Sequence, residues 1–300
     1  MMKVLVFGEI LYDVYGDKYS IGGAPFNFAI WLSRMIGTKE ALTMISALGN
    51  DDLALKALEF AKKEHIDTSL IELSTQFPTG KALVFLNEDK IPDYIIEENV
   101  AWDNIIFNEQ VSQALNLDYD IFYFNLLAQR FSTSYNTLKK IMQKVKAKFK
   151  VFDMTLRKEY FTKEKLFEAL NFINVLKVNE EELELIKKLF YPDFKSDVKQ
   201  ILALIQKDFN IPYIFLTLGE KGSCLQSLNG FFTQNARKDI KLVDTVGAGD
   251  SFCASLSYAL VKNLSEEKIL SFATEMAENV IQLQGGTTLF DFHQIKKRYF

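Results

Sequence analysis

Short runs of apolar residues alternate with longer amphipathic stretches along most of the chain. The apolar runs predict buried strands at 3–8, 42–48, 120–125, 151–153, 175–179 and 213–218. The amphipathic stretches predict helices at 25–37, 51–65, 135–149, 163–172, 180–190 and 197–209, with two successive helices at 247–262 and 266–284. Strands and helices that alternate in this order form crossover units. The pattern therefore predicts an α/β fold, with an open, mainly parallel sheet and helices on both faces.

One segment breaks this alternation. Residues 79–85 and 94–96 are apolar and rich in β-forming residues, and the turn-prone residues 87–89 separate them. We interpret the segment as an antiparallel hairpin outside the main sheet, part of a small β lid that spans about 79–100 and includes 10–20. A hairpin at the edge of the main sheet is the alternative. Because the chain has no repeat and no Pro/Gly/Ser linker, residues 1–300 are predicted to form one domain with this lid.

Composition narrows the class of protein. Lys plus Arg total 35 and Asp plus Glu total 39, a formal charge of −4, so the chain lacks the basic excess that binds nucleic acid. The lysines between 139 and 150 are interpreted as the solvated face of one helix. Two cysteines cannot build a disulfide framework, and no apolar run approaches the ~18 residues of a membrane span. The first apolar run is too short for a signal peptide, so we expect a cytoplasmic protein without membrane partners.

The segment 244–252 is the clearest candidate for a catalytic motif. It reads Asp-Thr-Val-Gly-Ala-Gly-Asp-Ser-Phe and begins an apolar helix, whereas the P-loop and dinucleotide-binding patterns are absent from the chain. Small residues at a helix N-terminus let backbone N–H groups converge on an anion. Asp250 among them can act as a base toward a hydroxyl while the amides hold a phosphoryl group. The alternative is a glycine turn with Asp250 as a helix cap.

A second cluster, Gly22–Asn27, follows a strand that ends near Gly8. Its glycines allow a ligand to approach the backbone closely. Asn27 and the nearby Asp13 can bind vicinal hydroxyls, at the strand end where open α/β sheets place their sites. The alternative makes Asp13 a turn cap and Asn27 a surface helix residue.

Taken together, these segments resemble the ribokinase-like (pfkB) carbohydrate kinase family. DTVGAGD at 244–250 is similar to its C-terminal signature and GGAPFN at 22–27 to its N-terminal one. Gly49-Asn50-Asp51, the NxxE motif at 179–182 and TLGxxG at 217–222 follow in the family order.

The resemblance implies an ATP-dependent kinase and assigns roles to matching residues. Asp250 is the general base, and Gly247, Ala248 and Gly249 form the anion hole. The sugar is bound by Asp13, Gly22, Gly23 and Asn27, and the nucleotide by Asn179, Thr217, Gly219, Gly222 and Gly249. Asn179 and Glu182 organise Mg²⁺ through water, although the same pattern is also an ordinary helix start. Asp244 and Val246 match positions that hold a monovalent cation such as K⁺ in some members, while Leu289 replaces the cation-site serine of ribokinases.

The sugar is predicted from finer similarities. Gly-Gly-Ala-Pro at 22–25 and Ala-Trp-Asp at 101–103 resemble fructokinases, so Asp103 is expected to reach the sugar from the lid side. Residues 152–157 resemble the Asp-Pro-Asn-x-Arg stretch of fructokinases and 2-keto-3-deoxygluconate kinases, which makes Arg157 a sugar-site candidate. No basic pocket for a sugar phosphate is evident.

A free sugar is therefore expected, with D-fructose favoured. The alternatives are 2-keto-3-deoxygluconate, ribose, a nucleoside, or a non-catalytic sugar or nucleotide sensor. The apolar lid strands also predict a homodimer that pairs through the lid.

Overall fold

The computed structural model describes residues 2–37, 41–86, 92–157 and 160–300. Within them, nine strands form one sheet in the order β13-β12-β11-β10-β9-β8-β1-β4-β5. The seven strands β11, β10, β9, β8, β1, β4 and β5 pair in parallel. At the other end of the sheet, β12 is antiparallel to β11 and β13 is antiparallel to β12. Their bounds are β1 Lys3–Phe7, β4 Ala41–Gly49, β5 Ile71–Ser74, β8 Asp118–Asn125, β9 Lys146–Asp153, β10 Val175–Asn179, β11 Tyr213–Thr217, β12 Ser223–Ser227 and β13 Gly230–Gln234. The predicted α/β fold is confirmed.

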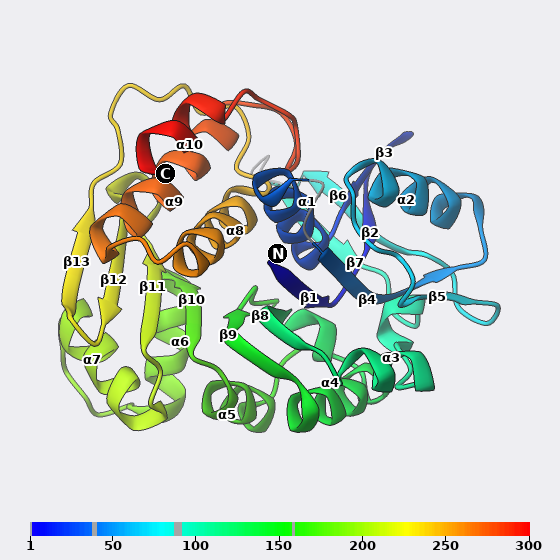
Figure 1. Cartoon of the computed structure of the whole chain (residues 1–300), viewed down its shortest axis with the longest axis horizontal. Helices are drawn as coiled ribbons and strands as arrows, with labels where there is room; N and C mark the ends of the chain where they lie inside the picture. The colour runs from blue at the N-terminus through cyan, green and yellow to red at the C-terminus, as the bar shows by residue number, and fades with distance from the viewer. Residues whose placement is uncertain (1, 38–40, 87–91, 158–159) are drawn as a thin grey trace.

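Helices cover both faces of this sheet (Figure 1). One face packs against α1 Ala24–Ile36, α2 Asp52–Lys63, α8 Ala248–Val261, α9 Glu266–Val280 and α10 His293–Tyr299. The other packs against α3 Glu109–Ala114, α4 Ser132–Lys144, α5 Lys163–Phe172, α6 Glu180–Phe190 and α7 Val198–Phe209. The central strand β1 serves both cores, because Val4 and Val6 join the first while Leu5 and Phe7 join the second. No helix among the described residues is long and apolar enough to cross a membrane.

A separate four-stranded sheet in the order β3-β2-β6-β7 forms the lid. Its strands are β2 Leu11–Tyr15, β3 Lys18–Gly22, β6 Gly80–Leu86 and β7 Pro92–Ile96. The pairs β2–β3 and β6–β7 are antiparallel, and β2 joins β6 in parallel. The predicted hairpin is confirmed and does not extend the main sheet; its turn at 87–89 lies outside the described residues.

One predicted helix is too long. The amphipathic pattern predicts a helix over 135–149, but α4 ends at Lys144 and β9 begins at Lys146. Residues 146–151 alternate lysine with apolar side chains, and β9 pairs with β8 along nearly its whole length. A period of two is a strand pattern, so the lysine run is split between a helix and a strand. The second C-terminal helix is also shorter than predicted, because α9 ends at Val280 and not at Gln284. The elements β5, β12, β13 and α10 were not predicted.

The carboxyl ends of the parallel strands define where a site forms. The last residues of β8 and β9, Asn125 and Asp153, are register partners, as are those of β10 and β11, Asn179 and Thr217. Parallel strands end at the same edge of a sheet, so polar residues from distant segments meet there. The loop after β1 joins this edge beside β8.

Candidate active site

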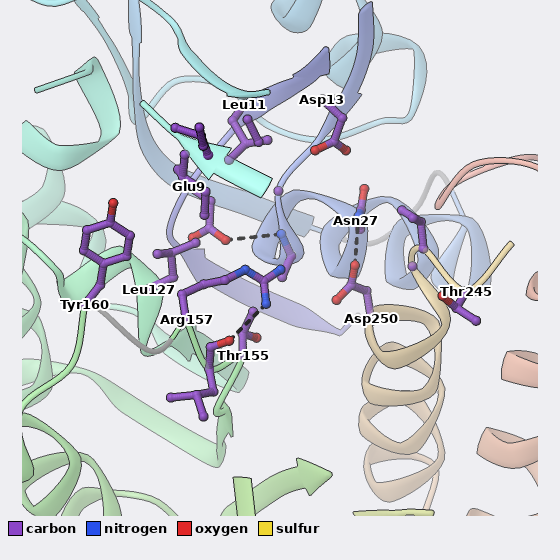
Figure 2. Close-up of a pocket in the computed structure, with 18 residues that line it drawn as sticks. Glu9, Leu11, Asp13, Asn27, Leu127, Thr155, Arg157, Tyr160, Thr245 and Asp250 are labelled. Atoms are coloured by element: carbon purple, nitrogen blue, oxygen red, sulfur yellow. Dashed lines mark hydrogen bonds between the residues drawn. The ribbon is translucent and has the colours of Figure 1, made fainter. Parts of the chain in front are cut away.

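A cavity of about 690 Å³ lies between the lid and the strand ends (Figure 2). This volume is in the range of small-molecule sites. Lid residues form one side, and the loops after β1 and β9 together with the starts of α1 and α8 form the others. The lining residues are Glu9, Leu11, Asp13, Gly23, Ala24, Asn27, Ala82, Ile95, Ile96, Leu127, Thr155, Leu156, Arg157, Tyr160, Thr245, Val246, Gly247 and Asp250.

Asp250 lies at the third position of α8 and meets Asn27 of α1 in the cavity. The Asn27 Nδ2 atom donates a hydrogen bond of 2.8 Å to Oδ2 of Asp250, which Figure 2 shows as a dashed line. Desolvation raises the pKa of Asp250, while the Asn27 bond and the charges of Lys177 and Arg157 oppose the rise. Among the described residues, Oδ1 of buried Asn27 has no hydrogen-bond partner. One amide side chain therefore orients the carboxylate and keeps an acceptor of its own.

Asp13 enters the cavity from lid strand β2, and the glycines beside it permit close packing. A Cβ atom on Gly22 would lie 2.8 Å from Oδ2 of Asp13. Gly23 has a φ of 105°, and a Cβ there would lie 2.6 Å from the carbonyl oxygen of Glu9. Burial raises the pKa of Asp13 to about 6, with Arg157 opposing the rise. The sequence-predicted sugar residues thus gather at one end of α1.

Glu9 is a cavity residue that the sequence analysis missed. It is 1% exposed, and its two carboxylate oxygens accept hydrogen bonds of 2.9 and 3.0 Å from Nδ2 of Asn125. The backbone N–H of Ala24, the first residue of α1, donates to Oε1 at 3.2 Å. Burial raises the pKa of Glu9 to about 7. Its position directly after β1 was the available signal, because a polar residue at the end of a central parallel strand faces the site.

Arg157 is the basic residue of the cavity lining. Figure 2 shows its side chain extending from the loop after β9 into the cavity that Glu9 and Asp250 line. Its charge lowers the pKa of Glu9, Asp13 and Asp250, against the burial that raises each of them. The structure thus places this candidate beside the predicted sugar residues.

Asp103 does not reach the cavity, which contradicts the expectation for it. It lies in the 3₁₀ helix Ala101–Asn104, and it is fully buried. Arg130 donates to both of its oxygens, at 2.6 and 2.8 Å, and the guanidinium carbon lies 4.0 Å from the centroid of the Trp102 ring. Both carboxylate oxygens are therefore engaged in a buried ion pair that supports the base of the lid.

The residues expected to bind the nucleotide lie at the neighbouring strand ends, outside this cavity. Asn179 ends β10 and caps α6: its Oδ1 accepts from the N–H of Glu182, and Glu182 accepts from the N–H of Asn179, each at 2.8 Å. Thr217 stands beside Asn179 in the sheet. Gly222 has a φ of 103°, and a Cβ there would lie 2.0 Å from a carbonyl oxygen of β13, so only glycine fits this turn.

Comparison with known proteins now decides the family. The profile described as pfkB family carbohydrate kinase matches residues 1–291. This chain belongs to the pfkB family.

Its relatives are named as kinases of different sugars. A ribokinase of Dictyostelium discoideum is 27% identical over 89% of this chain and 84% of its own length. A fructokinase of Salmonella typhimurium is 25% identical over 99% of both chains. The crystal structure of a Vibrio cholerae fructokinase with fructose, ADP and a calcium ion has a TM-score of 0.75 at 20% identity, covering 96% of this chain and 95% of that one. The pfkB-family protein is thus a sugar kinase, an ATP-dependent phosphotransferase, which sets aside the sensor alternative.

A divalent metal near the predicted nucleotide positions needs oxygen ligands, from the protein, from phosphates or from water. Among the described residues, no group of three or more His, Cys, Asp or Glu side chains could hold a metal ion. Oε1 of Glu182 accepts the N–H of Leu156 and Oε2 accepts that of Asn179, so both oxygens already have partners. Mg²⁺ commonly binds through substrate phosphates and retains waters. The role of Asn179 and Glu182 toward Mg²⁺ remains a prediction.

Lys177 places a buried positive charge beneath the predicted anion hole. Its Nζ lies 3.0 Å from the position of a Cβ on Gly249, and it forms an ion pair with Asp153 at 3.0 Å. Burial lowers the pKa of Lys177, but the charges of Asp153 and Glu182 outweigh this effect and raise it. The sequence analysis missed this ion pair, because lysine and aspartate inside two strands carry no motif.

Asp244 organises the backbone of the loop before α8. Its Oδ1 accepts the N–H of Val246 at 3.0 Å, and its Oδ2 accepts the N–H of Gly285 at 2.8 Å. Leu289, four residues after Gly285, has an exposed side chain. The assignment of Asp244 and Val246 to a monovalent cation remains a prediction.

Proposed function

We propose that this kinase transfers the γ-phosphoryl group of ATP to a hydroxymethyl group of free D-fructose, with Asp250 as the general base. The observation that carries the proposal is the hydrogen bond between Asn27 and Asp250, at the N-terminus of α8 and inside the cavity. The base and a sugar-binding amide are held together next to the helix end that is suited to a phosphoryl group.

The chemistry follows from this geometry. Asp250 accepts the proton of the sugar hydroxyl as the new O–P bond forms, and the bond between the γ-phosphorus and the bridging oxygen breaks to release ADP. The N–H of Gly249, in the first turn of α8, faces the helix end and can hold the charge of the moving group, whereas that of Ala248 also donates to the carbonyl oxygen of Thr245 at 3.3 Å. Lys177 adds a positive charge below them. Mg²⁺ bound to the phosphates neutralises further charge.

The charges of the cavity favour a neutral sugar. Its lining carries three carboxylates, on Glu9, Asp13 and Asp250, against the single guanidinium of Arg157. A sugar phosphate would bring more negative charge to a cavity in which the charge of Asp250 already raises the pKa of Glu9 and Asp13. Sugar hydroxyls instead find carboxylate and amide acceptors, which reward a hydroxyl strongly and penalise its absence. The Gly-Gly-Ala-Pro segment then favours fructose over ribose.

One observation favours a second substrate. Arg157 in the cavity could pair with the carboxylate of 2-keto-3-deoxygluconate. The substitution Arg157→Gln separates the two cases: kcat/KM for an acidic sugar should fall at least ~100-fold, because a charge pair is lost, and for fructose by less than about tenfold.

The decisive experiment is a coupled assay of ADP release with a sugar panel. Fructose, ribose, a nucleoside, 2-keto-3-deoxygluconate and fructose 6-phosphate are each supplied with ATP and Mg²⁺, and the product is identified by NMR. The highest kcat/KM is expected for fructose. A higher value for any other member would replace fructose as the substrate, and turnover with none of them would reject the proposed function.

A further inference from the structure

The loop after α9 lies directly against the predicted anion hole. Gly247, the residue before α8, has a φ of 76°, and a Cβ there would lie 2.3 Å from the carbonyl oxygen and 2.4 Å from Cα of Gly286. A Cβ on Gly286 would in turn lie 3.2 Å from Nδ2 of Asn27. Residues Gly285–Thr287, here called the strap, therefore touch both the anion hole and the amide that orients Asp250.

Helix α1 holds the strap through two side chains that the proposed mechanism does not use. Nε1 of Trp31 donates a hydrogen bond of 2.8 Å to the carbonyl oxygen of Gly286, and a guanidinium N–H of Arg34 donates to that of Thr287 at 2.7 Å. Trp31 is fully buried. Arg34 is itself fixed by Glu64 through hydrogen bonds of 2.7 and 2.8 Å, the geometry of a strong paired contact.

The opposite side of the strap is held by the loop that forms the anion hole. The N–H of Gly285 donates to Asp244, the first residue of the segment 244–250. The strap is thus bonded to that loop through Gly285 and to α1 through Gly286 and Thr287. Since Gly247 packs against backbone atoms of Gly286, moving the strap would move the anion hole.

We propose that Trp31 is a positioning residue for phosphoryl transfer, which holds the anion hole in register with Asp250 through the strap. The inference rests on the proposed function. Asn27 and Trp31 lie four residues apart, on the same face of α1. Asn27 orients the base, and Trp31 fixes the strap against which Gly247 packs. One helix face thereby aligns the base with the anion hole. In such a reaction, a misplacement of ~1 Å can cost ~100-fold in rate.

The test is Trp31→Phe, which keeps an aromatic ring and removes the N–H. The matched control is Trp102→Phe, because Nε1 of buried Trp102 has no hydrogen-bond partner among the described residues. We expect kcat of Trp31→Phe to fall at least ~10-fold while the KM for the sugar changes less than about threefold, because Asn27 and Asp13 remain in place. Trp102→Phe should keep kcat within about twofold.

Unfolding midpoints of both variants are measured in urea to separate positioning from general destabilisation. A Trp31→Phe enzyme with the kcat of Trp102→Phe, or one whose kcat and KM change together, overturns the inference. If Trp31→Phe does not fold, Arg34→Lys is used instead, because it weakens the second anchor and keeps the charge; unchanged kcat in that variant also overturns it. Wild-type protein inactive on every sugar shows instead that the proposed function has failed.

Discussion

Asp250 must be ionised to accept a proton, yet it lies where desolvation favours its neutral form. The Asn27 amide and two cations, Lys177 and Arg157, favour the ionised form and lower the pKa against this burial. The pKa of the group is nevertheless raised above its ordinary value of 3.8. The enzyme should therefore lose activity as pH falls through the raised pKa of this residue.

Asp250→Asn keeps the size of the side chain and removes the base. We expect kcat to fall by ~10²–10⁴-fold, the usual contribution of a general base, while the sugar and Mg·ATP still bind. Steady-state kinetics measure the loss, and calorimetry of sugar binding supplies the control. A folded variant with nearly full kcat would disprove the assignment of Asp250 as the base.

Glu9 should control how stability depends on pH. Burial raises its pKa from 4.5 to about 7, so the folded state binds a proton that the unfolded state has lost between these values. The stabilisation is complete below pH 4.5 and is lost as pH rises through 7, by about 3 kcal/mol at most. Glu9→Gln, which does not titrate, should be more stable relative to wild type at pH 8 than at pH 5.

Urea unfolding at both pH values measures this difference. The control is Glu98→Gln, which removes an exposed carboxylate. If Glu9→Gln differs from wild type by the same free energy at pH 5 and pH 8, Glu9 does not titrate in this range.

The sheet that forms the lid has two different faces, and one of them lines the cavity. Strand register places Asp13 opposite Ala82, and Ala82 opposite Ile96, so these three residues share the face that lines the cavity. Ala82→Leu should crowd the sugar and raise its KM at least ~10-fold, while the KM for ATP stays constant, since the nucleotide residues lie on other strands. Leu83→Ala, on the opposite face, is the control. Equal effects of the two variants on sugar KM would argue against the lid as the cover of the site.

The outer face of the lid carries one apolar row across its four strands. Register aligns Tyr19, Val14, Leu83 and Ile95, and three of them are exposed: Tyr19 by 52%, Leu83 by 39% and Ile95, which also borders the cavity at the end of β7, by 56%. Exposed apolar rows on a small sheet favour pairing with another copy. We predict a homodimer through this face, detected by sedimentation, that Leu83→Glu converts to a monomer. A monomeric wild type at all concentrations would contradict the prediction.

In the molecule as a whole, the proposed sugar site and the expected nucleotide site lie at different strand ends of one sheet. The proposed sugar site uses the loop after β1, α1 and the lid, whereas the expected nucleotide site uses the ends of β10 and β11. Because we expect the metal to bind together with the phosphates, EDTA should abolish turnover and leave sugar binding intact, as calorimetry can measure. Excess Mg²⁺ should restore the rate. Loss of sugar binding in EDTA would place a metal in the proposed sugar site.

The sequence alone determined the features that arise from local patterns. Alternating apolar runs and amphipathic stretches predicted the α/β fold, and the absence of a helical period at 79–96 predicted the hairpin. The glycine segments at 22–23 and 247–249 were found because close backbone approach needs glycine whatever surrounds it. The end of α4 at Lys144 was predicted too late in the chain. Lysines are equally common on an exposed helix face and at the solvent-exposed start of a strand.

Which side chains meet depends on how distant segments pack. Asn27 and Asp250 are 223 residues apart, Glu9 and Asn125 are 116 apart, and Trp31 and Gly286 are 255 apart. Asp103 shows the converse, because a resemblance to sugar-binding segments did not reveal that Arg130 occupies its carboxylate. A local pattern records how the backbone is built, whereas burial and hydrogen-bond partners depend on the packing of segments far apart in the chain. For that reason the sequence indicated the reaction, and the packing decided which residues could perform it.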